Sequence, residues 1–174
     1  MSKKDSFKPT NFTFLVSKFL IASGRMGGGY EKTIEMIDLS ISGNYQCPLW
    51  VNLPIAIHGA IGGLLDGIPI ICGGTNLAYT SNKCYEIKSK KSNEFVEMST
   101  ARSNAAGVVI NGSTLWITGG KDHNANVFSS TEFIQKNETM PGPKLPIPLV
   151  GHTMINIDND LTIVMGGGLT GLKK

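Results

Sequence analysis

The sequence is poor in charge and has neither a long apolar run nor a basic cluster. Only 17% of its 174 residues are charged, and the formal net charge is +3. No run approaches the ~18 apolar residues of a membrane span, so we expect no membrane-spanning segment. Lys and Arg are scattered apart from residues 88–91 (KSKK), and no aromatic platform accompanies them. We therefore expect no nucleic-acid partner.

Cysteine and histidine are also scarce, at three residues each. No CxxC or HxxxH spacing and no histidine-plus-carboxylate spacing forms a metal site. Residues 166–171 (GGGLTG) satisfy GxGxxG after an apolar strand, but the same glycine pair recurs elsewhere without the rest of a dinucleotide motif. We therefore expect no metal and no cofactor.

The dominant feature of the sequence is a repeated phrase, a short apolar strand that ends in a glycine pair. It occupies residues 18–24 (KFLIASG), 68–74 (IPIICGG), 114–120 (TLWITGG) and 161–167 (LTIVMGG). The last residues of successive phrases are 50, 46 and 47 positions apart. A period of this length predicts a propeller or a solenoid.

Each unit reads as four antiparallel strands, with the phrase as the second. Tight hairpins are expected before the phrase because the pairs there tolerate positive φ: Asp66-Gly67, Asn111-Gly112 and Asp158-Asn159. The third strand carries a glutamate 11 or 12 residues after the anchor: Glu35, Glu86 and Glu132. Because these glutamates repeat at one position in separate units, we expect them to hydrogen-bond a neighbouring turn rather than to act as paired catalytic carboxylates. The fourth strand is clearest at residues 50–54 and 95–99.

These features resemble the kelch repeat over residues 18–172. In that family a hydrophobic strand ends in Gly-Gly, and strands with a Tyr/Glu and an aromatic-x-x-Leu-Pro pattern follow. Ser23-Gly24 replaces Gly-Gly in the first unit, and the third unit lacks the aromatic in its last strand. The resemblance implies an all-β fold, with the units as blades of a β-propeller like kelch proteins and the galactose-oxidase central domain.

The repeat divides the chain into an N-terminal extension at 1–17 and kelch repeats at 18–174. The repeats comprise a partial blade (18–55), two blades (56–101 and 102–148) and a second partial blade (149–174). Propellers close with about 4–8 blades, and about three blade-equivalents predict an incomplete ring. We expect a fragment or partial gene product, which we favour, or missing blades supplied by self-association or by another chain.

Cys72 and Cys84 end the second strand and begin the third strand of one unit. Antiparallel pairing would place them opposite each other, close enough for a disulfide. The phrases ICGG and KCYEI are similar to those of extracellular kelch-type proteins of invertebrates, which implies a bond that staples the blade. The alternative is two reduced thiols in a cytosolic protein. Cys47 has no evident partner, and the compartment stays open, with an extracellular location favoured over a cytoplasmic one.

The loops after the glycine pairs vary in the way that recognition loops do. Their aromatic, polar and charged residues suit a protein contact surface. In kelch propellers this rim and the starts of the first strands hold the partner, which adds Ser103 and Asn104. The expected contact residues are Arg25, Tyr30, Asn76, Tyr79, Ser103, Asn104, Lys121, Asp122 and His123. The competing interpretation treats the same residues as solvated connectors.

The sequence therefore predicts a non-catalytic protein-interaction module, a scaffold or adaptor with an unidentified protein partner. One alternative is an extracellular galactose-oxidase-like protein with a carbohydrate or oxidase-related role. Its copper chemistry would need Tyr79, Tyr85 and Cys84 together with histidine ligands, which are not in phase with them. The other alternative is a non-functional partial gene product.

Overall fold

The computed structural model describes residues 18–26, 29–38, 49–157 and 161–168. Within these ranges every regular element is a β-strand and all pairing between strands is antiparallel, which confirms the expected all-β class. No helix there is long and apolar enough to cross a membrane. The N-terminal extension at 1–17, Cys47 and the Asp158-Asn159 turn lie outside the described residues.

The described strands form four sheets. The first sheet contains β1 (Lys18–Met26), β2 (Gly29–Asp38) and β3 (Leu49–Asn52). The second contains β4 (Ile61–Leu65), β5 (Ile68–Cys72), β6 (Lys83–Lys88) and β7 (Lys91–Glu97). The third contains β8 (Ala106–Ile110), β9 (Thr114–Thr118), β10 (Thr131–Gln135) and β11 (Glu138–Pro141). The fourth contains β12 (Val150–Asn156) and β13 (Thr162–Gly168).

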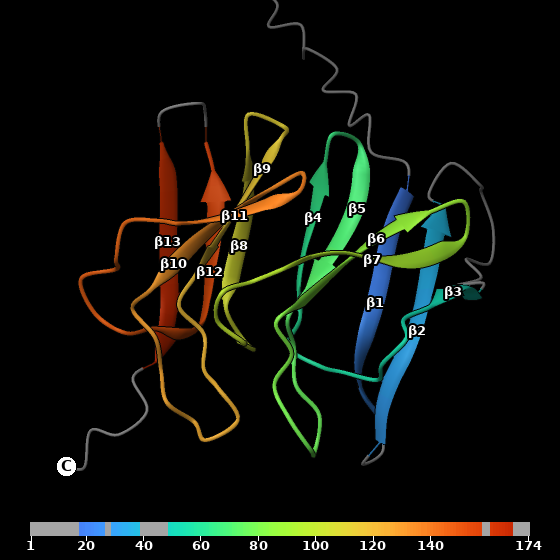
Figure 1. The fold of residues 1–174 in the computed structure, drawn as a ribbon, viewed down its shortest axis with the longest axis horizontal. Helices are drawn as coiled ribbons and strands as arrows, with labels where there is room; N and C mark the ends of the chain where they lie inside the picture. The colour runs from blue at the N-terminus through green and yellow to red at the C-terminus, as the bar shows by residue number, and fades with distance from the viewer. Residues whose placement is uncertain (1–17, 27–28, 39–48, 158–160, 169–174) are drawn as a thin grey trace, which may run out of the picture.

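The four sheets lie side by side in chain order, from the first sheet at the right of Figure 1 to the fourth at the left. Successive first strands contact one another, β4 with β8 and β8 with β12. The last strands β3, β7 and β11 also meet, but less extensively. Each sheet therefore has one face toward the preceding sheet, here called the N-side face, and one toward the following sheet, the C-side face.

Two of the predicted hairpins are present, at the same end of the second and third sheets (Figure 1). Asp66 and Gly67 have φ of 49° and 76°, and Asn111 and Gly112 have 52° and 69°. Asn-Gly and Asp-Gly accept these angles at low cost, and the resulting twist matches that of the flanking strands. The expected positive φ of these turns is confirmed.

The glycine pairs join each sheet to the next. The amide N–H of Gly24 donates to the Ile57 carbonyl at 3.1 Å, and that of Gly74 donates to Arg102 at 2.9 Å. Gly120 repeats the bond to Leu149 at 2.8 Å. Gly119, with φ of 60°, lies so close to the next segment that a Cβ would overlap the Leu149 carbonyl oxygen. Close approach between sheets therefore requires glycine here.

Two apolar clusters fill the spaces between the first three sheets. Ile34, Leu53 and Ile57 pack with Ile71 and Tyr85 between the first and second sheets. The cluster between the second and third sheets contains Ile61, Leu65, Ile70, Cys72, Cys84, Met98, Leu115, Ile117 and Ile134. Because side chains alternate along a strand, the second sheet supplies residues to both clusters.

The structure corrects the alignment of the third-strand glutamates. Ile117 pairs with Glu132, and the equivalent Ile71 pairs with Tyr85 rather than with Glu86. The loop before Glu132 is one residue longer, so counting along the sequence placed Glu86 one position too far. A one-residue shift moves a side chain to the other face of the sheet. Glu86 accordingly forms an ion pair with Lys88 at 2.7 Å instead of a bond to a neighbouring turn.

The third and fourth sheets meet at His152. Its Nε2 lies 2.8 Å from the hydroxyl oxygen of Thr118. The hydroxyl of Thr118 donates to the sulfur of Met154 at 3.0 Å. The ring is buried, and its Nδ1 has no hydrogen-bond partner among the described residues. Desolvation by burial lowers the pKa of His152 below its usual value.

We expect the free energy of unfolding to fall as the pH falls below about 6.5, the usual histidine pKa. The folded state holds His152 neutral, so the unfolded state binds more protons and gains stability on acidification. Urea unfolding at about pH 7.5, 6.5 and 5.5 measures this slope. His152→Gln should flatten it, whereas the matched change at the exposed His123 should leave it unaltered. Equal slopes in the wild type and His152→Gln would contradict the assignment.

Candidate protein-interaction surface

The loops that follow the glycine pairs lie at one end of the sheets, opposite the end that carries the tight hairpins (Figure 1). We call this end the rim; it comprises the β1–β2 end with Arg25 and Tyr30, loop 73–82 and loop 119–130. Arg25 lies in β1 at the register position opposite Tyr30. Short bridges from Thr75 to His58 and from Lys121 to Ser103 anchor the two loops to their own sheets.

A shallow groove of about 360 Å³ lies between the rim ends of the first and second sheets. Its lining residues are Tyr30, Ile55, Ala56, Asn76, Leu77 and Ala78. Leu77 is 81% exposed, the largest exposed fraction among the large apolar side chains described. The Tyr30 ring lies against that of His58, with 5.1 Å between centroids. The structure thus places Tyr30 and Asn76 in one groove, beside an apolar side chain that the sequence interpretation did not include.

Asn76 shapes the loop that carries Leu77. Its side-chain oxygen accepts from the amides of Ala78 and Tyr79 at 2.9 and 3.1 Å, as in an Asx turn. Its side-chain nitrogen donates to the Ala56 carbonyl at 3.4 Å. Tyr79, two residues after Leu77, is 44% exposed. The side chain of Asn76 therefore presents Leu77 and Tyr79 to solvent.

Loop 119–130 is separate from the groove lining. The carboxylate of Asp122 accepts from the side-chain and backbone nitrogens of Asn126, both at 2.8 Å. The side-chain hydrogen bond holds the pKa of Asp122 below its usual value, so its negative charge is retained. Lys121 pairs with Ser103 through its backbone, and His123 is exposed. This loop offers charge, whereas the groove offers apolar surface.

Ser103, predicted as a contact residue, is buried in the structure. Its side chain is 0% exposed, and its amide and carbonyl both bond Lys121 at 2.9 Å. Asn104 is half-buried and has a structural role in its backbone: its amide donates to Gly59 and its carbonyl accepts from Gly151. These bonds link the starts of three successive sheets. The lead-in to each first strand lies against its neighbours, which buries Ser103.

A buried ion pair that the sequence interpretation missed lies between the second and third sheets. The guanidinium of Arg102 is 2.5 Å from Glu132, and their side chains are 0% and 2% exposed. Arg102 also donates to the carbonyls of Gly119 and Ser130 at 2.7 and 3.0 Å. A single arginine among the small residues before a first strand was the available signal.

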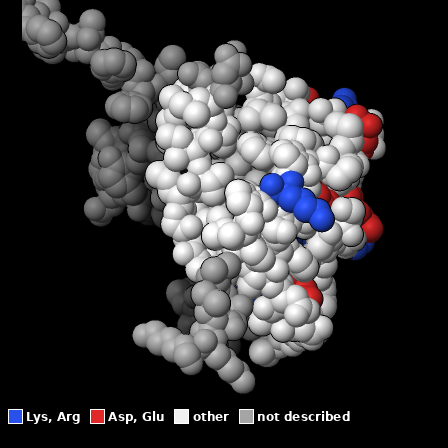
Figure 2. All heavy atoms as spheres, turned by 90° about the vertical axis from the view of Figure 1, so that its left-hand side faces the viewer, with Lys and Arg blue, Asp and Glu red and all other residues white. Residues whose placement is uncertain are grey.

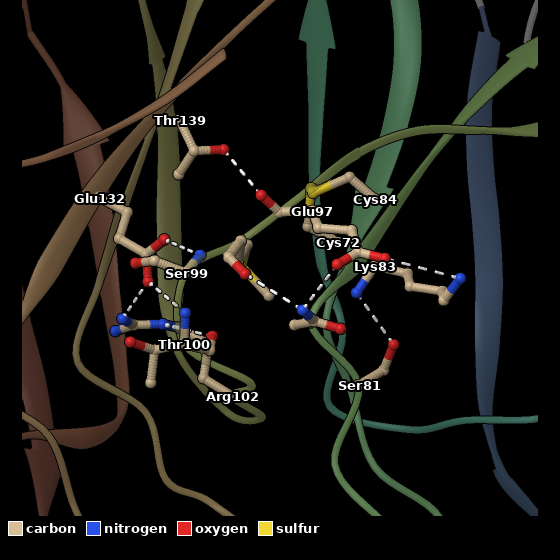
Figure 3. The surroundings of a disulfide bond; sticks show 12 residues. Cys72, Ser81, Lys83, Cys84, Glu97, Ser99, Thr100, Arg102, Glu132 and Thr139 are labelled. Atoms are coloured by element: carbon tan, nitrogen blue, oxygen red, sulfur yellow. Dashed lines mark hydrogen bonds and ion pairs between the residues drawn. A yellow bond between two sulfur atoms is a disulfide. The ribbon is translucent and has the colours of Figure 1, made fainter. Parts of the chain in front are cut away.

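Glu132 binds the turn that leaves the second sheet. Its two oxygens accept from the amides of Ser99 and Thr100 at 2.7 and 3.2 Å, as Figure 3 shows. The expected bond from a third-strand glutamate to a neighbouring turn is confirmed for this residue. The carboxylate is therefore occupied by backbone and guanidinium donors.

Cys72 and Cys84 form a disulfide with an S–S distance of 2.01 Å (Figure 3). They are directly paired across β5 and β6, and both are 0% exposed within the cluster between the second and third sheets. The residues named for copper chemistry are not assembled. Tyr79 lies in the rim loop, Tyr85 packs toward the first sheet, and Cys84 is in the disulfide. The described residues contain no cluster of three or more potential metal ligands.

No protein-family model matches this chain, and no curated protein matches it either.

Proposed function

We propose that the four sheets are successive blades of a kelch-type β-propeller and that the chain is a non-catalytic protein-interaction module. Three features support the blades. The glycine amides repeat the same hydrogen bond to the next sheet, the equivalent hairpin turns have similar positive φ angles, and the first strands approach one another more closely than the last strands do. Sheets that converge along their first strands and diverge along their last strands are expected around a central axis.

The observation that carries the binding role is the apolar groove at the rim. Leu77 is held out of the fold by a loop whose own hydrogen bonds are satisfied through Asn76. Exposed apolar surface with aromatic and polar neighbours is typical of protein contacts. Loop 119–130 adds the charged groups of Lys121 and Asp122 at the same end. We propose that a protein partner contacts both loops, with an apolar side chain in the groove.

Leu77→Glu should reduce retention of the bound partner about tenfold or more, because it places a charge in an apolar contact. Leu64→Glu is the matched control, since Leu64 is 57% exposed and lies near the opposite end. Affinity capture with cross-linking and mass spectrometry, on wild type and both variants, measures the change. Retention by Leu77→Glu equal to that of the control, or cross-links confined to residues 1–17, would contradict the rim proposal.

A further inference from the structure

The C-side face of the fourth sheet is apolar and exposed. Ile155 pairs with Ile163, and Thr153 pairs with Met165, so these four side chains share one face. Three of them are apolar and exposed: Ile155 at 46%, Ile163 at 38% and Met165 at 45%. Figure 2 looks onto this side of the molecule, where the described surface is largely uncharged.

The equivalent face of the second sheet is an interface. Counted from the glycine pair, Met165 corresponds to Cys72, and Ile163 corresponds to Ile70. Cys72 and Ile70 are 0% and 2% exposed, because the third sheet covers them. The exposed apolar side chains of the fourth sheet therefore occupy positions that the third sheet covers in the second sheet.

The first sheet has exposed apolar side chains on its N-side face. Ile21 and Leu49 both lie opposite Glu35 in the register and are 49% and 59% exposed. Ile21 corresponds to Ile71 and Ile117, which are 6% and 0% exposed because a preceding sheet covers them. Glu35 corresponds to Glu132, which shows that an interface between sheets accommodates a carboxylate at this position when backbone amides face it.

We propose that a second copy of this chain covers both faces, head to tail. The N-side face of the first sheet in one copy packs on the C-side face of the fourth sheet in the other. The chain carries both halves of one repeated interface, at opposite ends of the row in Figure 1. This inference rests on the proposed propeller arrangement. Two copies bring together eight sheets, within the ~4–8 blades that close a ring. A head-to-tail contact leaves a free face at each end of the assembly unless the ring closes.

The 174-residue chain at roughly 100 µM, well above a micromolar Kd, should have twice the monomer mass by light scattering and sedimentation. Ile21→Lys and Ile163→Glu should each give monomers, because each places a charge in the interface. An equimolar mixture of the two should regain the dimer mass. The mixed pair has one contact with both faces unaltered, which only a head-to-tail arrangement provides.

Intact Cys72–Cys84 by mass spectrometry and an unchanged circular dichroism spectrum establish that the variants fold. A monomeric wild type overturns the proposal. Dimers of the Ile21→Lys variant on its own also overturn it, because they would indicate that the fourth sheets of two copies pair with each other. Open polymers would overturn closure. Dimers that appear only after removal of residues 169–174 or 1–17 would assign the cover to the chain itself. Leu77→Glu should remain dimeric, so the rim and assembly proposals fail separately.

Discussion

Replacing Glu132 with glutamine lowers the free energy of unfolding by about 3–5 kcal/mol. The change keeps the shape of the side chain and removes its charge. Arg102 is fully buried and then has no opposing charge in the space between the second and third sheets. The amides of Ser99 and Thr100 also lose a charged acceptor. Equilibrium urea unfolding measures the loss.

The control for this prediction is Glu86→Gln. Glu86 also forms an ion pair, with Lys88, but the side chains are 20% and 44% exposed. An ion pair that water reaches contributes about 0–1 kcal/mol, so this variant should unfold close to the wild type. A loss at Glu132 no larger than the loss at Glu86 would contradict the stabilising role assigned to the buried pair.

Removing the disulfide by Cys72→Ala with Cys84→Ala lowers the free energy of unfolding by about 3 kcal/mol. The bond closes a short loop, with a sequence separation of 12, and restricts the unfolded chain. Both sulfurs are also buried in the apolar cluster, so the small alanines leave part of that space unfilled. Chemical denaturation should show a loss for the reduced wild type and a somewhat larger loss for the variant, because only the variant leaves space unfilled.

A Cys47→Ser background isolates the bond, since Cys72 and Cys84 are then the only cysteines in the chain. Alkylation of unfolded, unreduced protein followed by mass measurement should detect no free thiol. Two alkylated cysteines in native material would contradict the bond and would favour a reducing compartment.

Local features of the sequence predicted much of the fold. Glycine pairs and the Asp-Gly and Asn-Gly turns impose their backbone angles on their own residues, so their positions could be identified directly. The register of the third strands could not, because it depends on the length of the preceding loop. Glu86 was placed wrongly for this reason, and Tyr85 occupies the position expected for it.

The candidate surface was predicted less completely than the fold. The loops were identified from their variability, and Tyr30, Asn76 and Tyr79 do lie at the rim. Leu77 was missed because an exposed apolar residue has no distinguishing sequence pattern. The burial of Ser103 was not predicted because it depends on neighbouring segments of the chain rather than on its own strand.

The sequence by itself determined the period of the units, the second strands, the hairpins and the proximity of Cys72 to Cys84. The period follows from comparing the units, and each of the others follows from residues within one unit. Only the tertiary structure decided how Arg102 meets Glu132, which residues line the rim groove, and which sheet faces stay exposed. These depend on contacts between segments that are distant in the sequence. Arg102 and Glu132 are 30 residues apart, and Glu132 also binds the amides of Ser99 and Thr100 in the preceding unit.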